Sequence, residues 1–411
     1  MKKIIIIILV AILLLVSGFI SYRFFFDKKE VKEIVYIDAK LDTNIIVDGE
    51  INVEYGKIEY LNNYISLANG TMDVIELKYE DLGENTIKFY YNDENGKNYR
   101  FIKFSVVDTT KPYVSVPTYK TVLVNSDISF INDFFCADNH DRNVDKTLEG
   151  DYDLGTVGTY NAVYKATDES GNSVEKNIVL RVVEELPKAE KTQPKPINYI
   201  PYEELYNTYK TDNTLVGIDV SRWQGDIDFD LLENNNVEFI MIRLGGQDGV
   251  DGEYYLDSKY KQNMDEATKR GFKIGVYFYS YAYTKEEAIN QAKYVIKNLK
   301  GYKLELPIVF DWECWNKFNS MNISLYDITQ VQDAFLNYVN EKGYRSSRYG
   351  SKNYLINAWQ DSKHLTWLAH YISETNYEGD YFMWQRCDTG KIPGINGAVD
   401  VDVLYLDKYK F

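Results

Sequence analysis

The stretch PIVFDWECW, residues 307–315, is an apolar strand-like run that ends in two acids, each followed or preceded by tryptophan. Asp311 and Glu313 stand two positions apart, so their side chains project from the same face of a β-strand. A buried carboxylate without a partner or a task is costly, so this pair is either satisfied structurally or used chemically. The residues that the rest of the chain places around this pair determine whether its role is structural or chemical.

From Leu215 onward, strand-like and helix-like patterns alternate. Eight segments have strand character: LVGIDV, EFIMIRL, KIGVYFYSYA, LPIVFDWE, YRSSRYGS, TWLAHYI, YFMWQ and AVDVDVLYL. Helical patterns separate the early segments, whereas short connections join the last ones. Such alternation with right-handed crossovers predicts a TIM-type (β/α) barrel that is irregular and lacks helices in its last third.

Reactive groups in such barrels lie at the carboxyl ends of the strands. Four acids fall at or near such positions, namely Asp219, Asp311, Glu313 and Asp400. We expect them to converge on one rim, interleaved with aromatic side chains from Tyr277, Tyr279, Trp367, Tyr371 and Trp384. Tyr277 and Tyr279 alternate with apolar residues, which leaves a second interpretation open. In it, the two tyrosine side chains simply fill the interior of the barrel.

Length and composition limit the broad class. A chain of 411 residues predicts two to four structural units, and a hydrophobic content of 45% is that of a globular protein. The formal charge of −16 argues against nucleic acid or anionic lipid as the main partner. The 37 tyrosines and 6 tryptophans suit cores and strands, and they also suit flat platforms for sugars.

The three cysteines, Cys136, Cys314 and Cys387, are odd in number and form no zinc spacing. They therefore predict neither a disulfide framework nor a metal cluster, and we interpret all three as structural. No metal and no cofactor is expected at the site.

The N-terminus is MKKIIIIILVAILLLVSGFISYRFFFDKK, uncharged from Ile4 to Tyr22. As a helix this run would span about 28 Å, close to the thickness of a bilayer core. Apolar residues continue to Phe26 past a poor cleavage site. We therefore predict an uncleaved transmembrane signal-anchor over residues 1–27, with the remainder outside the cell, and a cleaved secretory signal is the alternative.

Residues 33–183 contain a repeat. GENTIKFYYNDENG (83–96) aligns without gaps with GTYNAVYKATDESG (158–171), and each copy reads as strand, turn and strand. Two small all-β sandwiches are predicted, over 33–108 and 109–183. The second copy, with DTTKPYV at its start, ADNHD in its middle and ATDESGN near its end, resembles bacterial immunoglobulin-like surface modules, and the first copy resembles them more weakly. Within the second, ADNHDRNVD (137–145) suits either a cation or a solvated polar turn, and we favour the turn.

Residues 184–205 hold four of the eight prolines, which predicts a stiff linker and a boundary before a domain at 206–411. That domain contains GIDVSRWQGDIDF, GVYFYSYAYTKEEAINQA, PIVFDWE, TWLAHY and MWQRCDTGKIPGINGAVDVDV in this order. Together these motifs resemble the glycoside hydrolase family 25 lysozymes. The resemblance implies an N-acetylmuramidase that cuts the β-1,4 bond between N-acetylmuramic acid and N-acetylglucosamine in peptidoglycan.

The resemblance places the family's paired acids on Asp311 and Glu313, its early aspartate on Asp219 and its late aspartate on Asp400. It adds Gln224, Arg243 and Gln385 to the aromatic residues as substrate-binding candidates. The chain departs from the usual pattern at Arg386 and Cys387, where Tyr-Ser is common, at Asp402, where Asn is common, and at Trp312, where a smaller aliphatic residue is common.

We predict Glu313 as the general acid, with a pKa raised by its tryptophan neighbours and by the charge of Asp311. Two routes remain open: a retaining route in which the substrate's acetamido group attacks, and an inverting route in which Asp219 or Asp400 activates water. The predicted protein is a membrane-tethered peptidoglycan hydrolase that faces the cell wall. The alternative is a wall-binding or adhesive surface protein with little catalysis.

Overall fold

The computed structural model describes residues 44–79, 81–188 and 196–411. The chain forms two compact units, one with Ile58–Val107 and the residues up to Glu54, the other with Asp108–Phe411 and Tyr55–Lys57. The predicted anchor over residues 1–27 lies outside the described residues. Within the described ranges, no helix is both long enough and apolar enough to cross a membrane.

The first unit, called here the first β module, is built from two sheets. Its larger sheet has the order β2 (Asn52–Glu54), β6 (Gly96–Val107), β5 (Gly83–Asp93) and β4 (Thr71–Met72), and its smaller sheet pairs β1 (Ile45–Val47) with β3 (Ile65–Leu67). A short 3₁₀ helix, η1 (Leu61–Asn63), precedes β3. The antiparallel hairpin of β5 and β6 confirms the predicted strand, turn and strand at the first copy of the repeat.

The second β module, residues 108–183, repeats this plan. One sheet has the order β10 (Asp145–Glu149), β11 (Gly158–Thr167), β12 (Ser173–Val183) and β8 (Tyr119–Leu123), and β7 (Tyr113–Ser115) pairs with β9 (Phe135–Ala137). Buried side chains from both sheets and from η2 (Ile128–Asp133) form one core. The hairpin of β11 and β12 confirms the predicted elements at the second copy.

The C-terminal part of the second unit is an eight-stranded barrel, as predicted. Around it run β14 (Thr214–Val220), β15 (Phe239–Gln247), β17 (Lys273–Ser280), β18 (Ile308–Trp312), β19 (Ser346–Ser351), β20 (Leu365–Ala369), β21 (Met383–Lys391) and β22 (Val399–Tyr405). The pairing of β22 with both β21 and β14 closes the ring. A short strand, β16 (Tyr254–Leu256), pairs with β15 outside it.

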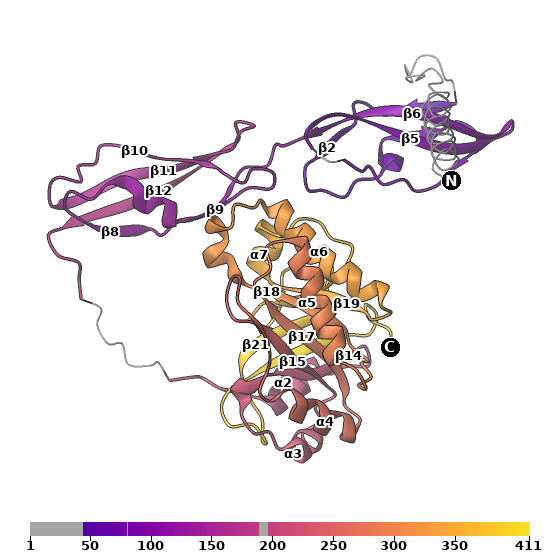
Figure 1. Cartoon of the computed structure of the whole chain (residues 1–411), viewed down its shortest axis with the longest axis vertical. Helices are drawn as coiled ribbons and strands as arrows, with labels where there is room; N and C mark the ends of the chain where they lie inside the picture. Colours follow the sequence, from indigo (N-terminus) through magenta and orange to yellow (C-terminus); the bar gives the residue numbers. More distant parts are fainter. Residues whose placement is uncertain (1–43, 80, 189–195) are drawn as a thin grey trace, which may run out of the picture. The chain divides into compact units, whose positions relative to one another are not determined.

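Helices connect the strands only in the first part of the barrel. They are α3 (Phe229–Asn234), α4 (Tyr260–Arg270), α5 (Lys285–Asn298), α6 (Leu325–Glu341) and α7 (Lys352–Asn357), together with the 3₁₀ turns η3 (Arg222–Gln224) and η4 (Cys314–Ser320). Figure 1 shows the helices outside the strands. Between β20 and β22 the described chain has no helix, so its last third is irregular as predicted.

The last strand differs from a regular parallel barrel. β22 runs antiparallel to both of its neighbours, whereas the other strands of the ring pair in parallel. A parallel crossover needs a dozen or more residues, usually including a helix. The connection from Lys391 to Val399 is too short for that, so the chain turns back on itself. Consequently the start of β22, with Asp400, lies at the rim formed by the carboxyl ends of the other strands.

The predicted boundary at residue 206 is corrected by the structure. The end of the predicted linker forms β13 (Ile200–Pro201), which pairs with β21, and the start of α2 (Tyr202–Tyr209). The side chain of Tyr202 is 1% exposed, and its hydroxyl donates to the carbonyl of Val216 at 3.0 Å. The barrel domain therefore begins at Ile200, inside the predicted linker and before its last proline, Pro201.

The preferred interpretation of ADNHDRNVD as a solvated turn is also wrong. Asp138 and Asn139 are each 1% exposed, because this loop packs within the second unit. Their backbone carbonyls accept hydrogen bonds from Leu325 and Tyr326, the first amides of α6, at 2.7 and 3.2 Å. Helix N-termini leave such amides unpaired, so the loop caps the helix.

Candidate active site

A cavity of about 300 Å³ opens at the rim of the barrel. Its lining consists of four acids, one arginine and a set of aromatic and amide side chains: Asp219, Asp311, Glu313, Asp400, Arg243, Tyr277, Tyr279, Tyr349, Trp367, Tyr371, Trp223, Ser221, Gln224 and Gln385. The carboxyl ends of parallel strands meet at this rim, which is where barrels of this class carry reactive groups.

The four acids reach the cavity from three places around the ring. Asp219 and Asp400 lie opposite one another on the antiparallel strands β14 and β22. Asp311 is on β18, and Glu313 follows it directly, at the residue where the strand gives way to η4. The two-residue spacing of the pair therefore directs both carboxyls to one cavity.

Asp311 and Glu313 differ in their access to solvent. Asp311 is 6% exposed, whereas Glu313 is exposed at the cavity. Burial raises the pKa of Asp311 well above its usual range, and the charge of Glu313 adds to this rise. Burial also raises the pKa of Glu313, although part of its side chain is exposed to the cavity. The more accessible acid is thus the one that a substrate can reach.

Of the two predicted causes of the Glu313 shift, burial does raise the pKa, whereas Asp311 acts in the opposite direction. Its hydrogen bond with Asp311 lowers its pKa, as does the positive charge of Arg243, and burial outweighs both. The neighbouring tryptophans face elsewhere: the indole of Trp312 donates to the carbonyl of Ala282 at 2.9 Å, and Trp315 stacks on Tyr354 with ring centroids 4.3 Å apart. Both indoles are buried in the hydrophobic core.

A polar network fixes Asp219. The amide nitrogen of Gln385 donates to Asp219 Oδ2 at 2.8 Å, and the amide oxygen of Gln385 accepts from the hydroxyls of Tyr349 and Tyr371 at 2.8 and 2.9 Å. Because both ends of the amide are engaged, its orientation is set. Burial raises the pKa of Asp219 to about 7, although the hydrogen bond from Gln385 acts against the rise.

The pKa values of both carboxyls on β22, Asp400 and Asp402, are raised, which favours their uncharged forms. Burial and the charge of Asp219 raise the pKa of Asp400 to about 9. Asp402 is fully buried below the cavity, where burial and the same charge raise its pKa well above the usual range. Its Oδ1 accepts from the indole of Trp367 at 2.9 Å. A carboxyl that stays protonated has the shape and donor capacity of an amide, which accounts for Asp at a position where Asn is common.

Arg243 supplies the positive charge in the cavity wall. Its guanidinium lies over the ring of Tyr279, 4.9 Å from the centroid, and donates to the hydroxyl of Tyr255 at 2.7 Å. Among the described residues that line the cavity, it is the only lysine or arginine. It opposes the rise in pKa of both Asp311 and Glu313.

Of the predicted substrate-binding residues, all but one line the cavity. The exception is Trp384, which is 2% exposed and packs in the core between strands and helices. Its indole donates to the carbonyl of His370 at 2.8 Å. Side chains alternate between the two faces of a strand, so Gln385 faces the cavity and the preceding Trp384 faces outward.

Three lining residues were not predicted: Ser221, Trp223 and Tyr349. Trp223 is 73% exposed, a rare environment for tryptophan and the usual one for a stacking platform. It lies in the motif DVSRWQG beside the predicted Gln224, so its position was already a signal. Tyr349 could have been found by extending the alternation of YRSSRYGS to the carboxyl end of that strand.

All three cysteines are buried and free, consistent with the predicted structural role.

Comparisons with known proteins identify the barrel. Residues 218–395 match the family described as glycosyl hydrolases family 25. The autolytic lysozyme of Clostridium acetobutylicum is 30% identical over 189 residues, which cover 45% of this chain and 54% of that protein. Lysozyme M1 of Streptomyces globisporus is 24% identical and covers 45% of this chain and 65% of that protein.

A solved family 25 glycosyl hydrolase from Bacillus anthracis has 23% identity and a TM-score of 0.41, covering 48% of this chain and 92% of that one. The chain thus spans about half the length of the first of its curated relatives. The residues that match the family model, 218–395, lie in the barrel.

Proposed function

We propose that this chain is a peptidoglycan hydrolase that cleaves the β-1,4 bond between N-acetylmuramic acid and N-acetylglucosamine. One observation carries the proposal: in a domain of a glycoside hydrolase family, Asp219, Asp311, Glu313 and Asp400 line one cavity with a single arginine. Glycosidic cleavage requires a proton for the leaving oxygen and negative charge near the developing oxocarbenium ion. Paired carboxyls in different environments supply both.

In this proposal Glu313 donates the proton. It is exposed to the cavity, and its raised pKa keeps it protonated to a higher pH than an ordinary glutamic acid. Activity should therefore decline as pH rises through that raised pKa, because the acid is then lost. Asp311, buried beside it, orients the reacting group and stabilises positive charge once it is ionised.

Two routes use the same acid. In the retaining route the substrate's own acetamido group attacks with support from Asp311. In the inverting route Asp219 or Asp400, across the cavity, activates a water molecule. The anomeric configuration of the first product separates the routes.

The glycan is expected to lie against the aromatic wall of the cavity. Trp223 of η3, exposed at the rim, offers a flat face to a sugar ring. Tyr279 of β17 and Tyr371, which follows β20, line the same cavity. Arg243 is placed to bind an acidic or amide group of the substrate.

The remaining parts of the proposal rest on the sequence and on topology. We infer that the two β modules are immunoglobulin-like sandwiches that hold the barrel away from a membrane anchor at residues 1–27, with the barrel facing the cell wall. The two-sheet core of the second module supports the first part, and the uncharged run supports the second. Recovery of a soluble protein that begins near Phe19 would refute the anchor.

Incubation of purified peptidoglycan with the chain tests the function. Release of soluble fragments supports hydrolysis. If the protein sediments with the wall and releases nothing, it is a binding protein, which is the alternative function.

A further inference from the structure

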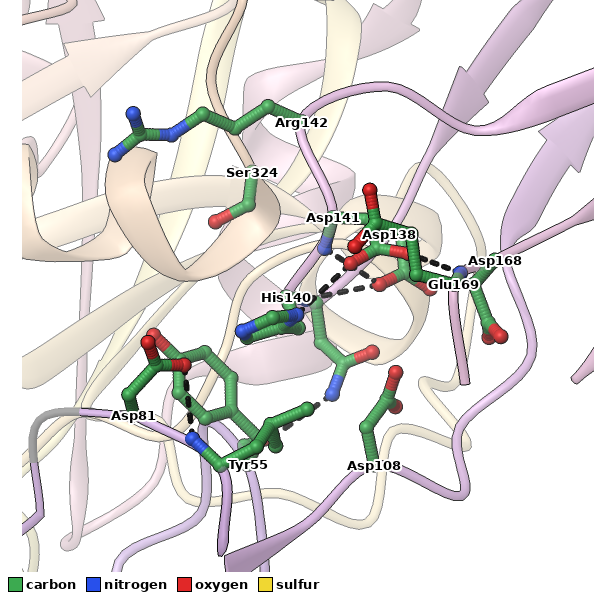
Figure 2. Close-up of polar contacts among 12 residues, drawn as sticks. Tyr55, Asp81, Asp108, Asp138, His140, Asp141, Arg142, Asp168, Glu169 and Ser324 are labelled. Atoms are coloured by element: carbon green, nitrogen blue, oxygen red, sulfur yellow. Dashed lines mark hydrogen bonds and ion pairs between the residues drawn. The ribbon is translucent and has the colours of Figure 1, made fainter. Parts of the chain in front are cut away.

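The second β module contains three buried aspartates that converge. Asp108 opens the module, Asp138 follows β9, and Asp168 follows β11. They are 8%, 1% and 5% exposed, and each contributes a carboxylate oxygen within 4.8 Å of the others (Figure 2). They are remote in sequence from the barrel acids and take no part in the proposed hydrolysis.

Hydrogen bonds hold Asp138 and Asp168 in place without neutralising them. Asp138 Oδ1 accepts from the amides of His140 and Asp141, both at 2.9 Å. Asp168 accepts from the backbone amide and the side-chain nitrogen of Asn172 at 2.7 and 2.9 Å. In the described part of the chain no lysine or arginine forms an ion pair with Asp138 or Asp168. Burial and the charges of the other two aspartates raise the pKa of Asp138 to about 7.

A second observation points to a ligand. Asp138 Oδ2 and Asn139 Oδ1 are buried oxygens without a hydrogen-bond donor among the described residues. The nitrogen of the Asn139 amide is engaged, since it donates to the carbonyl of Tyr55 at 3.1 Å. A carboxyl oxygen can be satisfied by gaining a proton, but an amide oxygen cannot. Asn139 directly follows Asp138, so this loop carries an unpaired buried amide oxygen next in sequence to an unpaired buried carboxylate oxygen of the aspartate cluster. Together the two orphaned oxygens call for a cation.

We propose that Asp108, Asp138 and Asp168, together with the amide oxygen of Asn139, bind a calcium ion in the second β module. Calcium takes carboxylate and amide oxygens at about 2.3 to 2.6 Å, so two of its ligands lie at most about 5 Å apart. The spacing of the three oxygens meets this limit. Magnesium prefers to keep several waters and a strict octahedron, which a buried set of protein oxygens disfavours.

The site has a structural consequence for the barrel. The loop that carries Asp138 and Asn139 also caps the first amides of α6. Bound calcium would fix this loop, and with it the contact between the second β module and the barrel. The first β module offers a contrast. Its Asp93, which aligns with Asp168 in the repeat, accepts hydrogen bonds from the nearby Asn95 and Asn98.

Calorimetry and thermal unfolding of the full chain, freed of metal and titrated with calcium or magnesium, test the proposal. One calcium per chain should bind and raise Tm, with magnesium weaker. Asp138→Asn and Asp108→Asn should each weaken calcium binding at least tenfold, whereas Asp93→Asn, the matched control, should bind like the wild type.

Wild-type protein that shows neither binding nor a Tm change at millimolar calcium would overturn the proposal. Unchanged affinity in folded Asp138→Asn protein would do the same. Tighter binding of magnesium than calcium would overturn the assignment of the ion. Calorimetry measures calcium binding to the wild-type protein directly. If Asp138→Asn fails to fold, the wild-type titration and the affinity of Asp108→Asn still test the proposal.

Discussion

At the scale of single residues, the different roles that we propose for Asp311 and Glu313 rest on their different access to solvent. Glu313 faces the cavity and Asp311 lies beneath it, although the two are separated by one residue. Sequence predicted both acids and their shared face, because a strand has a period of two. It also predicted that burial raises the pKa of Glu313, but not that Asp311 lowers this pKa, because the hydrogen bond between the two side chains depends on their geometry.

Glu313→Gln should retain the fold and abolish proton donation. General acid catalysis typically contributes ~10² to 10⁴-fold, so turnover of peptidoglycan should fall at least 10²-fold. Tm and turnover are measured on the same sample. A variant that melts normally and still turns over near the wild-type rate would remove Glu313 from its role, and a large drop in Tm would indicate a structural role instead.

Asp400→Asn should change the pH dependence of stability. The pKa of Asp400 is raised to about 9 in the folded protein from an ordinary value of 3.8, so the folded state binds its proton more tightly. The stability this contributes is present below about pH 4 and is lost as pH rises through 9. The asparagine variant keeps a neutral group throughout. Its Tm, relative to wild type, should rise between pH 5 and pH 10, and a constant difference would contradict the shift.

At the scale of elements, the sequence predicted strands and helices better than their ends and directions. The repeat gave both hairpins, and the eight barrel strands all appear. The direction of β22 was missed because the sequence pattern of a strand does not show whether it runs parallel or antiparallel to its neighbours. Only the short connection before β22 determines that it is antiparallel. The start of the barrel was missed because prolines near residue 200 resemble a linker, whereas Pro201 stands at the N-terminus of α2, where proline is tolerated.

Tyr202→Ala tests the corrected boundary. This side chain is 1% exposed and hydrogen-bonds within the barrel, so its truncation should cost about 3 to 5 kcal/mol of unfolding free energy. Tyr199→Ala, at a position 43% exposed, is the control and should cost less than about 1 kcal/mol. Chemical denaturation of the full chain gives both values. Equal, small losses would restore the linker interpretation.

At the scale of the whole molecule, the second β module and the barrel belong to one compact unit, although their sequence patterns predicted separate ones. Asn319 of η4 accepts from the amide of Cys136 and donates to the carbonyl of Phe134, at 3.3 and 2.7 Å. Contacts between polar residues that lie far apart in the sequence leave no local sequence pattern from which they could be predicted. The hairpins of the repeat and the acids of the barrel rim were predictable from repeats and motifs, but this packing was not.

The anchor belongs to this scale as well. If the apolar run remains attached, protein isolated from membranes should begin at or near Met1 and resist extraction by salt, because apolar burial is insensitive to ionic strength. Sequencing of the N-terminus and a salt wash measure this. A form cleaved after the run and released by salt would contradict it.

The central claim is that the barrel cuts peptidoglycan between N-acetylmuramic acid and N-acetylglucosamine. Its most direct test is digestion of purified peptidoglycan with the intact chain, followed by chemical reduction and identification of the newly formed sugar ends. We predict reduced N-acetylmuramic acid, formed by the wild type and not by Glu313→Gln. Reduced N-acetylglucosamine, or strands without new ends, would contradict the claim.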